Sequence, residues 1–419
     1  MASAALPTSS PSANVKCRSC GKVGLNNILS LGQMPLANTL LTEAQLSQAE
    51  PTWPLDLEWC PDCSLVQIAA SVPPEKMFRD HAYFSSLSES LVRQAKEIAH
   101  DLTAGLQLNA NSLVIEVASN DGYLLQWYKQ AGIPVLGIEP ARNIARMAEV
   151  QKGIPTITEF FNRELAQQLA KKGQKADVIH ANKVLTNVPD LNGFVAGFRE
   201  ILKPDGVLVA EVPYLKDLID NVEFDTIYHE HVCYFSLTAL DRLFRRQGLM
   251  ICEVERLPTH GGSIRIYARP LSNMRPAMSV VRMLAQEDEW AYRESYYRQF
   301  GQRVDGLRDD LVALLKRLKS QNKRIAVYGA TAQGSLLLNY LGVGPDVLEY
   351  AVDRNTITQG RFTPGMHLKV HNPEQLIRDK PDYCLLLNWN AADEVLAQQR
   401  QYREQGGKFI IPIPTVRVA

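Results

Sequence analysis

The sequence predicts an α/β protein with three successive parts: a small N-terminal zinc-binding module, a central Rossmann-like domain and a C-terminal Rossmann-like α/β domain. Two observations predict it. Short apolar segments alternate with helical ones in two separate stretches, and the paired cysteines all precede the first stretch. A chain of 419 residues is long enough for two or three such units. We expect a disordered tail over 1–14, the module over 15–75, the central domain over 76–280 and the last domain over 281–419.

The charge balance excludes some classes of partner. Lys and Arg together number 45, as do Asp and Glu, so the formal net charge is zero. A nucleic-acid coat or a membrane-surface protein would carry a basic excess, so we expect neither partner. No apolar run approaches the ~18 residues that span a bilayer, and the N-terminus lacks the pattern of a secretory signal. Seven cysteines are far fewer than a disulfide scaffold uses, which predicts a reduced, cytoplasmic protein.

Four of the cysteines form two C-x2-C pairs, Cys17 with Cys20 and Cys60 with Cys63. Two thiolates three residues apart in a tight turn can face one ion, and two such turns complete a tetrahedral zinc site. A site of four sulfurs leaves no position for water, so this zinc would be structural. A redox dithiol or unliganded thiols are the alternatives.

The central stretch starts with a helical pattern over 80–106, where apolar residues recur at three- and four-residue spacing. Strands and helices then alternate, which indicates βαβ units around a largely parallel sheet. The last two strands are close in sequence, so we expect an antiparallel strand at the sheet edge. The expected strands are 112–118, 133–140, 176–182, 206–213, 250–257 and 262–269.

The segment VIEVASNDGYLL (114–125) ends the first of these strands. Only Gly122 stands where a dinucleotide motif needs three glycines, so a pyrophosphate cofactor is poorly supported. An acidic residue in the strand (Glu116), a turn of small residues and the run Asn120-Asp121-Gly122 precede a helix, and Glu139 ends the second strand. A carboxylate there can bind ribose hydroxyls, so the pattern favours S-adenosylmethionine over NAD. Turn chemistry without a ligand is the alternative.

A third motif is Tyr228-His229-Glu230-His231. If the segment is extended, Tyr228 and Glu230 share one face and the two histidines share the other. An imidazole here suits a general base for a carbon-bound proton beside a carbonyl. A structural histidine and a metal ligand are the alternatives.

The C-terminal stretch begins with long polar helices over 285–320 and continues with strands at 324–330, 347–353, 383–389 and 408–414. Its turn GATAQG (329–334) has Thr331 at the central glycine position of a nucleotide-binding turn, and Asp353 ends the next strand. A sharp turn with no ligand explains this pattern equally well.

In this order, these features resemble the S-adenosylmethionine-dependent sugar C-methyltransferases of deoxysugar biosynthesis. The resemblance covers the chain after the N-terminal tail. The motifs that carry it are the two C-x2-C pairs, LGQMPLAN (31–38), Tyr83 with Ser85 and Ser86, EVASNDGYLL (116–125), GIEP (137–140), YHEHVCYFS (228–236), HGGSIR (260–265) and GATAQG (329–334).

The resemblance implies a class I methyltransferase fold for the central domain, a structural Zn²⁺ held by the four cysteines and S-adenosylmethionine as the methyl donor. It implies a nucleotide-linked 4-keto-deoxysugar as the substrate, dTDP-linked and methylated at C-3, in the cleft between the last two domains. His231 would remove the proton next to the ketone, and the enolate would attack the methyl group. The oligomeric state is not predicted.

Residue roles also follow from the resemblance. It implies catalytic roles for His231, Tyr228, Glu230 and Tyr83. It implies that the cofactor is contacted by Glu116, Ala118, Asn120, Asp121, Gly122, Glu139 and Asn182. It implies that the substrate is contacted by Asn187, His260, Gly329 and Thr331. The family often has a histidine before V-P-D, where this chain has Asn187, an amide that can donate a hydrogen bond but cannot exchange a proton. The competing functions are an NAD-dependent nucleotide-sugar oxidoreductase or epimerase, and a zinc-containing binding protein with a non-catalytic methyltransferase domain.

Overall fold

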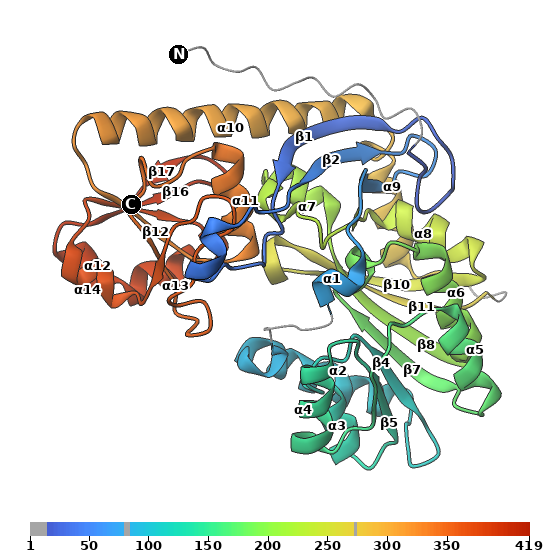
Figure 1. Cartoon of the computed structure of the whole chain (residues 1–419). Coiled ribbons are helices and arrows are strands. Elements are labelled where there is room, and N and C mark those ends of the chain that lie inside the picture. Colours follow the sequence, from blue (N-terminus) through green and yellow to red (C-terminus); the bar gives the residue numbers. More distant parts are fainter. Residues whose placement is uncertain (1–14, 79–83, 272–274) are drawn as a thin grey trace.

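The protein is described by a computed structural model, which covers residues 15–78, 84–271 and 275–419. Three β-sheets organise these residues (Figure 1). One sheet lies in the N-terminal module, one in the central region and one in the C-terminal region. Within the described residues, no helix is long and apolar enough to cross a membrane.

The N-terminal sheet has four antiparallel strands, β1 (Asn26–Met34), β2 (Trp53–Trp59), β3 (Val66–Ile68) and β9 (Cys233–Tyr234). The last of these comes from the middle of the chain, where Cys233 pairs with Gln67. The module therefore shares a sheet with the segment that follows the YHEH motif, a connection that the sequence did not reveal. The short helices η1 (Glu43–Ser47) and α1 (Pro74–Phe78) complete the module.

The central sheet has seven strands in the order β10-β11-β8-β7-β4-β5-β6. The strands of this sheet are β4 (Val114–Val117), β5 (Val135–Ile138), β6 (Thr156–Ile157), β7 (Ala176–Asn182), β8 (Leu202–Pro213), β10 (Leu249–Leu257) and β11 (Ser263–Pro270). All neighbouring pairs are parallel except those of β11, which is antiparallel to β8 and to β10.

The antiparallel pairing expected at the sheet edge is present, although the strand that runs opposite to the others is β11, one place in from the edge. The short connection after β10 forces β11 to pair antiparallel with it. The strand β10 takes the edge, and β11 fills the place between β10 and β8.

Helices cover both faces of the central sheet, and Figure 1 shows the two groups on opposite sides. Val114 and Val178 pack toward one group, whereas Ile115 and Ile179 belong to the core on the other side, as the alternation of strand side chains requires. The first group is α2 (Glu89–Gly105), α3 (Leu125–Gln130) and α4 (Arg142–Lys152); the second is α5 (Arg163–Lys171), α6 (Leu191–Ile201) and α8 (Leu237–Arg246). The short helix α7 (Leu215–Asp220) follows β8.

Two helices, α9 (Met278–Glu287) and α10 (Glu294–Ser320), lead to the C-terminal region, and α10 runs along the top of Figure 1. The Glu287 carboxylate accepts hydrogen bonds from Leu237 N at 2.8 Å and Thr238 N at 2.6 Å. This contact satisfies amides at the start of α8, which otherwise have no partner inside the helix.

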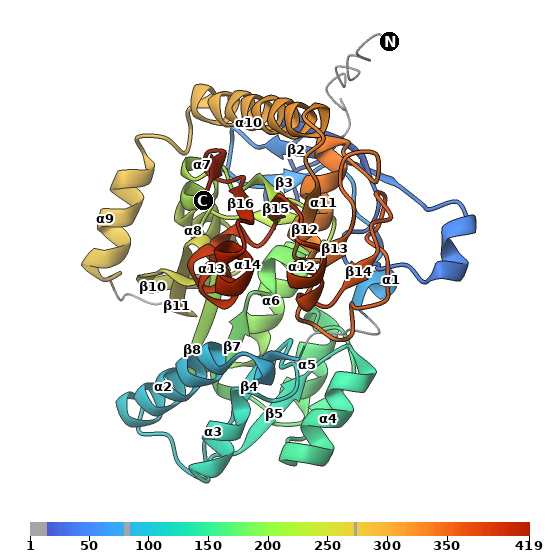
Figure 2. The ribbon, with the colours of Figure 1, turned by 90° about the vertical axis from the view of Figure 1, so that its left-hand side faces the viewer.

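The C-terminal sheet has the order β14-β13-β12-β15-β16-β17 and is parallel except for β17 (Figure 2). Its strands are β12 (Ile325–Tyr328), β13 (Ala351–Val352), β14 (Val370–His371), β15 (Tyr383–Leu386), β16 (Lys408–Ile411) and β17 (Arg417–Val418). The helices are α11 (Ala332–Leu341), α12 (Glu374–Asp379), α13 (Ala392–Gln398) and α14 (Arg400–Glu404). The first five strands follow the order of nucleotide-binding α/β folds.

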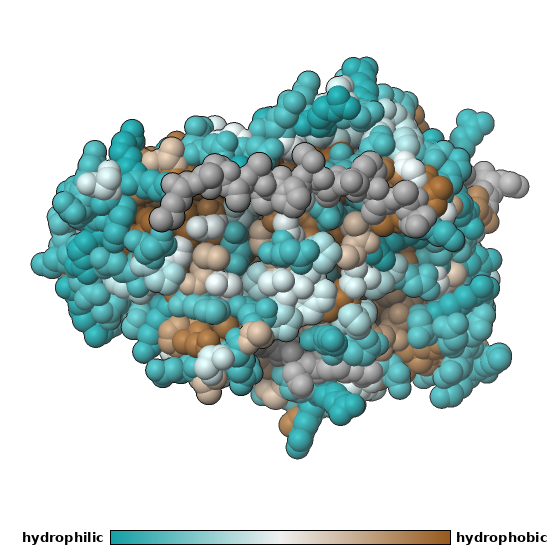
Figure 3. All heavy atoms as spheres, turned by 45° about the horizontal axis from the view of Figure 1, so that its top comes forward, coloured by the Kyte–Doolittle hydropathy of each residue, from teal (hydrophilic) through white to brown (hydrophobic). Residues whose placement is uncertain are grey.

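The N-terminal module also contacts the C-terminal region. Leu41 and Phe362 exchange two backbone hydrogen bonds of 2.9 Å, and the Glu50 carboxylate accepts one from Gly365 N at 2.8 Å. The face of the molecule in Figure 3 is mostly hydrophilic, with its apolar side chains in separate groups.

Candidate active site

The two C-x2-C segments fold into equivalent turns. In the first, Gly21 N donates to Cys17 O and Cys17 N donates to Lys22 O; in the second, Ser64 N donates to Cys60 O and Cys60 N to Leu65 O. Gly21 and Ser64 both take the left-handed conformation that such a turn requires, with φ of 76° and 64°. The repeated geometry aims both thiols of each pair toward one point.

All four sulfur atoms lie within 4.8 Å of one another. Cys17 Sγ is 3.4 Å from Cys63 Sγ, and Cys20 Sγ is 3.6 Å from Cys60 Sγ, too far for disulfides. Sulfurs around a tetrahedral zinc ion are about 3.8 Å apart, given Zn–S bonds of about 2.3 Å. Thiolate donors in this arrangement fit Zn²⁺ and leave no position open for catalysis.

The zinc-binding turns pack against the central region. Asn192 Nδ2, in the first turn of α6, donates to Arg18 O at 2.8 Å and to Ser19 O at 3.1 Å. The guanidinium of Arg18 lies within hydrogen-bond distance of Pro189 O (3.5 Å) and Ile68 O (3.4 Å). The first C-x2-C turn therefore supports the loop that precedes α6.

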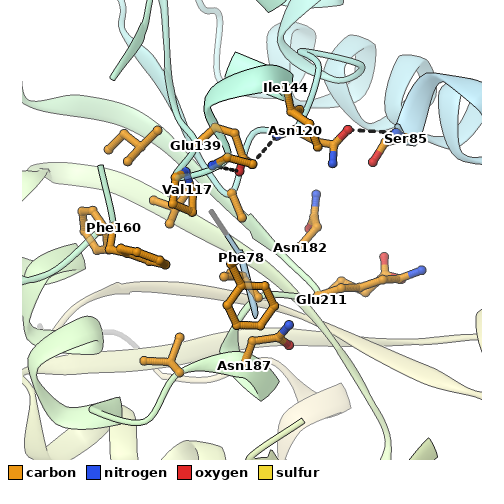
Figure 4. A pocket seen from close by; sticks show the side chains of 18 of the residues that line it. Phe78, Ser85, Val117, Asn120, Glu139, Ile144, Phe160, Asn182, Asn187 and Glu211 are labelled. Carbon is orange, nitrogen blue, oxygen red and sulfur yellow. Dashed lines mark hydrogen bonds and ion pairs between the residues drawn. The ribbon is translucent and has the colours of Figure 1, made fainter. Parts of the chain in front are cut away.

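A cavity of about 660 Å³ opens at the carboxyl ends of β4, β5, β7 and β8. Its volume is in the range of small-molecule and cofactor sites, and its position is where open α/β sheets bind ligands. Apolar side chains such as Phe160, Phe161 and Ile144 form much of the wall, while Asn120, Glu139, Asn182, Asn187 and Glu211 contribute polar groups (Figure 4).

The turn after β4 forms one wall of this cavity. Ala118, Asn120 and Gly122 all have positive φ, of 57°, 48° and 74°. Glycine suits position 122, because its φ favours glycine and a Cβ would collide with the end of the buried Ile154 side chain. The Asn120 side chain fixes the turn, since its Oδ1 accepts from Asp121 N at 2.9 Å and from Ser85 N at 2.8 Å.

Glu139 ends β5 beside this turn. Its two carboxylate oxygens accept hydrogen bonds from Asn120 N at 3.0 Å and from Ala141 N at 2.9 Å. Burial raises the pKa of this carboxyl above its usual value, and the two amide donors oppose that shift. Each carboxylate oxygen can accept a second hydrogen bond, so Glu139 can also receive a pair of ribose hydroxyls.

Three residues expected at the cofactor lie behind the wall. Among the described residues, the cavity lining includes Ala118, Asn120, Glu139 and Asn182 but not Glu116, Asp121 or Gly122. Glu116 is fully buried, and its burial together with the neighbouring Glu139 and Asp121 carboxylates holds its pKa well above the usual value. The Lys152 ammonium donates to Asp121 O at 2.7 Å and lies 3.4 Å from Asp121 Oδ2.

The other end of the cavity carries charged residues that the sequence analysis did not identify. Glu211 lies near the end of β8, 3.4 Å from Arg265 Nη2 and 3.8 Å from Lys183 Nζ, and accepts from Thr259 Oγ1 at 3.1 Å. Burial lowers the pKa of Lys183 despite the carboxylate. The sequence did contain a signal for both, because Lys183 and Glu211 are polar residues near the carboxyl ends of two predicted parallel strands.

Asn187 also lines this end, and its amide has a defined orientation. Thr186 Oγ1 lies 2.6 Å from Asn187 Oδ1, and its hydroxyl donates to that oxygen. The amide nitrogen keeps its two protons for other acceptors. Asn187 is therefore arranged as a hydrogen-bond donor.

The YHEH segment is a turn, so the two faces of an extended segment do not apply to it. His231 N donates to Tyr228 O at 2.8 Å, and this brings Tyr228 and His231 together. Tyr228 Oη lies 3.1 Å from His231 Nε2, and His231 Nδ1 lies 2.9 Å from Thr226 O. A carbonyl can only accept, so Nδ1 carries the proton and Nε2 accepts from the tyrosine hydroxyl. Desolvation lowers the pKa of His231 to about 4, which keeps the ring neutral near pH 7.

The other two residues of the motif make different contacts. Asn38 Nδ2 lies 2.8 Å from both carboxylate oxygens of Glu230, which connects the LGQMPLAN segment to the motif. His229 is buried and packs edge-on against Trp53, with ring centroids 6.2 Å apart. It belongs to the packing between the module and the central region.

The motif lies next to the Asn187 end of the cavity, because Val232 N donates to Thr186 O at 2.7 Å. Within the described part of the chain, Tyr228, Glu230 and His231 are not among the residues that line the cavity. Tyr228 and His231 are each half-buried. Tyr83 and the side chain of His260 lie outside the described residues.

The C-terminal sheet has a similar turn. Thr331 is the N-cap of α11, and its Oγ1 accepts from Gly334 N at 3.1 Å. Gly329 has a φ of 108°, and a Cβ there would collide with Asn388 Oδ1. Asp353 accepts from Ala330 N at 2.7 Å and from Asn355 N at 2.8 Å. Gly329 and Thr331 thus belong to a separate sheet edge from the cavity.

Comparison with known proteins identifies the family of this chain. Three protein families match in succession: a zinc binding domain over residues 17–78, a methyltransferase domain over 91–254 and the C-methyltransferase C-terminal domain over 258–414. The chain is 35% identical over 407 residues to the C-methyltransferase NovU of Streptomyces niveus, and the match covers 96% of each chain. The chain belongs to the C-methyltransferase family.

Other similarities cover only part of the chain. A ubiquinone biosynthesis O-methyltransferase of Cereibacter sphaeroides is 31% identical over 118 residues, 27% of this chain and 46% of that protein. Among solved structures, the chain is similar to the magnesium protoporphyrin IX methyltransferase of Synechocystis with bound S-adenosylhomocysteine. The TM-score is 0.36 and the identity 15%, and the match covers 43% of this chain and 83% of that one.

Family membership favours methyl transfer over both competing functions. This protein is an S-adenosylmethionine-dependent C-methyltransferase with a zinc-binding module. The cavity fits the methyl donor in volume and chemistry, since it combines apolar walls with the Glu139 carboxylate.

Proposed function

We propose that the enzyme methylates a nucleotide-linked 4-keto-deoxysugar, dTDP-linked, at C-3, the carbon next to the ketone. The observation that carries the proposal is the Tyr228–His231 pair. His231 holds its proton on Nδ1 and points an unprotonated Nε2 at a tyrosine hydroxyl, beside the Asn187 end of the cavity. A ketone substrate needs these two groups, a base for the carbon-bound proton and a donor for the oxyanion.

The first step follows from the hydrogen bond between the two residues. The keto oxygen of the sugar replaces His231 Nε2 as the acceptor of the Tyr228 hydroxyl. The released lone pair of Nε2 then takes the proton from the carbon next to the ketone, and the C–H electron pair forms the enolate. Burial raises the pKa of Tyr228, so the phenol keeps its proton and stabilises the enolate oxygen.

In the second step the enolate carbon would attack the methyl group of the donor, so the new carbon–carbon bond would form as the methyl–sulfur bond breaks, with S-adenosylhomocysteine as the leaving group. S-adenosylmethionine, when bound, supplies an electrophilic methyl group. Ala118, Asn120 and Glu139 would hold the donor at one end of the cavity, while Asn187 donates a hydrogen bond to the sugar at the other. The protein thereby fixes the two reactants in one geometry, and His231 retains the substrate proton until release to solvent.

Support for a nucleotide-linked sugar comes from the C-terminal sheet. Asp353 and the Gly329–Gly334 turn repeat the contacts that Glu139 makes with the turn after β4. An acidic residue at this place in an α/β sheet suits a ribose or deoxyribose hydroxyl. We assign Gly329, Thr331 and, from the motif alone, His260 to the nucleotide-sugar site.

The test is incubation with methyl-labelled S-adenosylmethionine and a panel of 4-keto-6-deoxysugars linked to dTDP, UDP or GDP. We expect label in the sugar from the dTDP series, with NMR locating the methyl group at C-3. A methyl group at C-5, or a preference for another nucleotide, would correct the substrate while keeping the reaction. Absence of transfer to every keto sugar would reject the proposed substrate class.

A further inference from the structure

A hydrogen bond joins the C-terminal region to the segment that carries the YHEH motif. Trp389 lies in the short helix η6 (Trp389–Ala391), directly after β15, and its Nε1–H donates to Asp225 Oδ2 at 2.6 Å. Asp225 lies in η4 (Phe224–Thr226) of the central region and is fully buried. The distance of 2.6 Å is that of a short hydrogen bond, and it gives the buried carboxyl group of Asp225 a partner.

The residue after Asp225 holds the catalytic histidine. Thr226 O accepts the Nδ1 proton of His231 at 2.9 Å, and this bond selects the tautomer in which Nε2 is unprotonated. A shift of η4 would move this carbonyl. The tautomer and orientation of His231 therefore depend on what fixes η4 in place.

Two side-chain contacts join η4 to the C-terminal region. Besides the Trp389 contact with Asp225, the Phe224 ring packs edge-on against Tyr340 of α11, with centroids 5.3 Å apart. Tyr340 in turn donates to Asp305 of α10 at 2.7 Å. Three successive residues thus form a link: Phe224 and Asp225 contact the C-terminal region, and Thr226 contacts His231.

Asn388, the residue before Trp389, reaches the GATAQG turn. Its side-chain amide occupies the place that a Cβ at Gly329 would take. Asn388 Oδ1 is buried and, within the described residues, has no hydrogen-bond partner. An unpaired buried oxygen is costly, so a ligand that donates a hydrogen bond at this turn would favour one position of Asn388.

We infer that Asp225 and Trp389 are positioning residues, which connect the Gly329–Asn388 turn of the C-terminal domain to the tautomer and orientation of His231. This inference rests on the proposed role of His231 as the base. Substrate bound at the turn fixes Asn388 and Trp389, Trp389 holds Asp225, and Thr226 O holds His231 Nδ1–H. The base is fully formed only when the C-terminal domain is in place against η4.

The main test replaces Trp389 with Phe, which removes the donor and keeps an aromatic ring. Trp290→Phe is the matched control, because Trp290 is a buried indole whose Nε1 has no hydrogen-bond partner in the described structure. We expect Trp389→Phe to lower kcat about 10-fold, the effect of one lost hydrogen bond, with the KM for S-adenosylmethionine unchanged. Trp290→Phe should leave kcat near that of the wild type.

A second readout needs no sugar. Histidine ¹⁵N NMR, with His231 assigned from the His231→Asn spectrum, should show the Nδ1–H tautomer in the wild type and in Trp290→Phe. In Trp389→Phe we expect a mixture of tautomers. Asp225→Ala should give the same change, and the double variant should be no worse than Asp225→Ala alone, because both substitutions break one link.

The outcomes separate the two proposals. Unchanged His231 resonances and unchanged kcat in Trp389→Phe would overturn the positioning role. If the tautomer changes in Trp389→Phe but the wild-type enzyme methylates no keto sugar, the proposed substrate is rejected and the positioning role is kept. If Trp389→Phe does not fold, a second pair of variants serves the same purpose. Asp225→Asn keeps an acceptor oxygen and should retain the wild-type tautomer of His231, whereas Asp225→Ala should lose it. Equal His231 spectra for these two variants would refute the inference.

Discussion

Glu139 accepts a hydrogen bond from the backbone N–H of Asn120 at 3.0 Å, across the gap between the ends of two neighbouring strands. The same contact recurs in the C-terminal sheet, where Asp353 accepts from Ala330 N at 2.7 Å. Each carboxylate also accepts a hydrogen bond from the backbone amide two residues after it: Glu139 from Ala141 N, and Asp353 from Asn355 N. Both α/β regions therefore fix the turn after the first strand with a carboxylate from the end of the second.

The Glu139 contact predicts a test of the cofactor site. Glu139→Ala should weaken binding of S-adenosylhomocysteine by ~1–3 kcal/mol, because the ribose hydroxyls and two turn amides lose an acceptor. Glu139→Gln keeps one carbonyl acceptor and should lose less. Isothermal titration calorimetry measures both. Equal affinities for Glu139→Ala and the wild type would remove Glu139 from the site.

The zinc centre gives a second prediction. Freshly purified protein should contain one zinc per chain, and Cys60→Ser should lose it, since three sulfurs bind the ion less well than four. The melting temperature should fall as well, because the turns pack against Asn192 and Arg18 reaches toward Pro189 O. Elemental analysis and thermal unfolding are the measurements, with Cys252→Ser, a cysteine away from the cluster, as the control. Zinc-free wild-type protein would contradict the prediction.

His231 carries the third prediction. His231→Ala and His231→Asn should bind both ligands yet lose turnover by ~10²–10⁴-fold, the usual contribution of a positioned acid–base group. Exchange of solvent deuterium into the carbon next to the ketone should disappear with turnover, because it reports proton removal alone. His229→Asn, at a buried residue packed on Trp53, should affect stability more than exchange. Retained exchange in His231→Ala would place the base elsewhere.

The pH dependence is a fourth prediction. An imidazole must be neutral to accept a proton, so activity is lost as the pH falls through its pKa. Desolvation lowers the pKa of His231 to about 4, below its ordinary value. The acidic limb of kcat/KM should therefore lie well below pH 6, with the fold checked by circular dichroism at each pH. A limb near 7 would indicate a carboxyl such as Asp225, whose pKa burial raises to about 7.

Much of the architecture was predictable because it depends on local patterns. The spacing of Cys17, Cys20, Cys60 and Cys63 predicted the sulfur cluster, and apolar runs predicted most strands of the two larger sheets. The predicted strand over 347–353 is shorter, Ala351–Val352, although Glu349 N and Tyr350 O before it also form backbone hydrogen bonds with β12. The pairing of β9 with β3 depends on residues distant in sequence, which no local pattern reveals.

The site was predictable in part for the same reason. Ala118, Asn120, Glu139 and Asn182 follow strand ends, and the structure places them in the cavity wall; their contacts with the cofactor stay a prediction. Lys183, Glu211 and Arg265 were missed because their meeting depends on strand order, and β11 entered the sheet between β8 and β10. The YHEH turn was missed because its shape depends on Thr226 O and Thr186 O, acceptors outside the motif.

The fifth prediction concerns Asn187, which lines the cavity. Thr186 Oγ1 lies 2.6 Å from Asn187 Oδ1 and donates to it, so the two amide protons remain for a substrate oxygen. Asn187→Ala should raise the KM for the sugar by about 5-fold, the effect of one hydrogen bond of about 1 kcal/mol, with less change in kcat. Thr186→Val removes the donor that orients the amide and should raise KM in the same direction, whereas Thr186→Ser keeps the hydroxyl and should not. Steady-state kinetics at saturating S-adenosylmethionine separates kcat from KM.

Two outcomes would contradict this prediction. A loss confined to kcat in Asn187→Ala would mean that the amide acts on the transition state. Identical kinetics for Thr186→Val and Thr186→Ser would show that the Thr186 hydroxyl does not set the orientation of the amide.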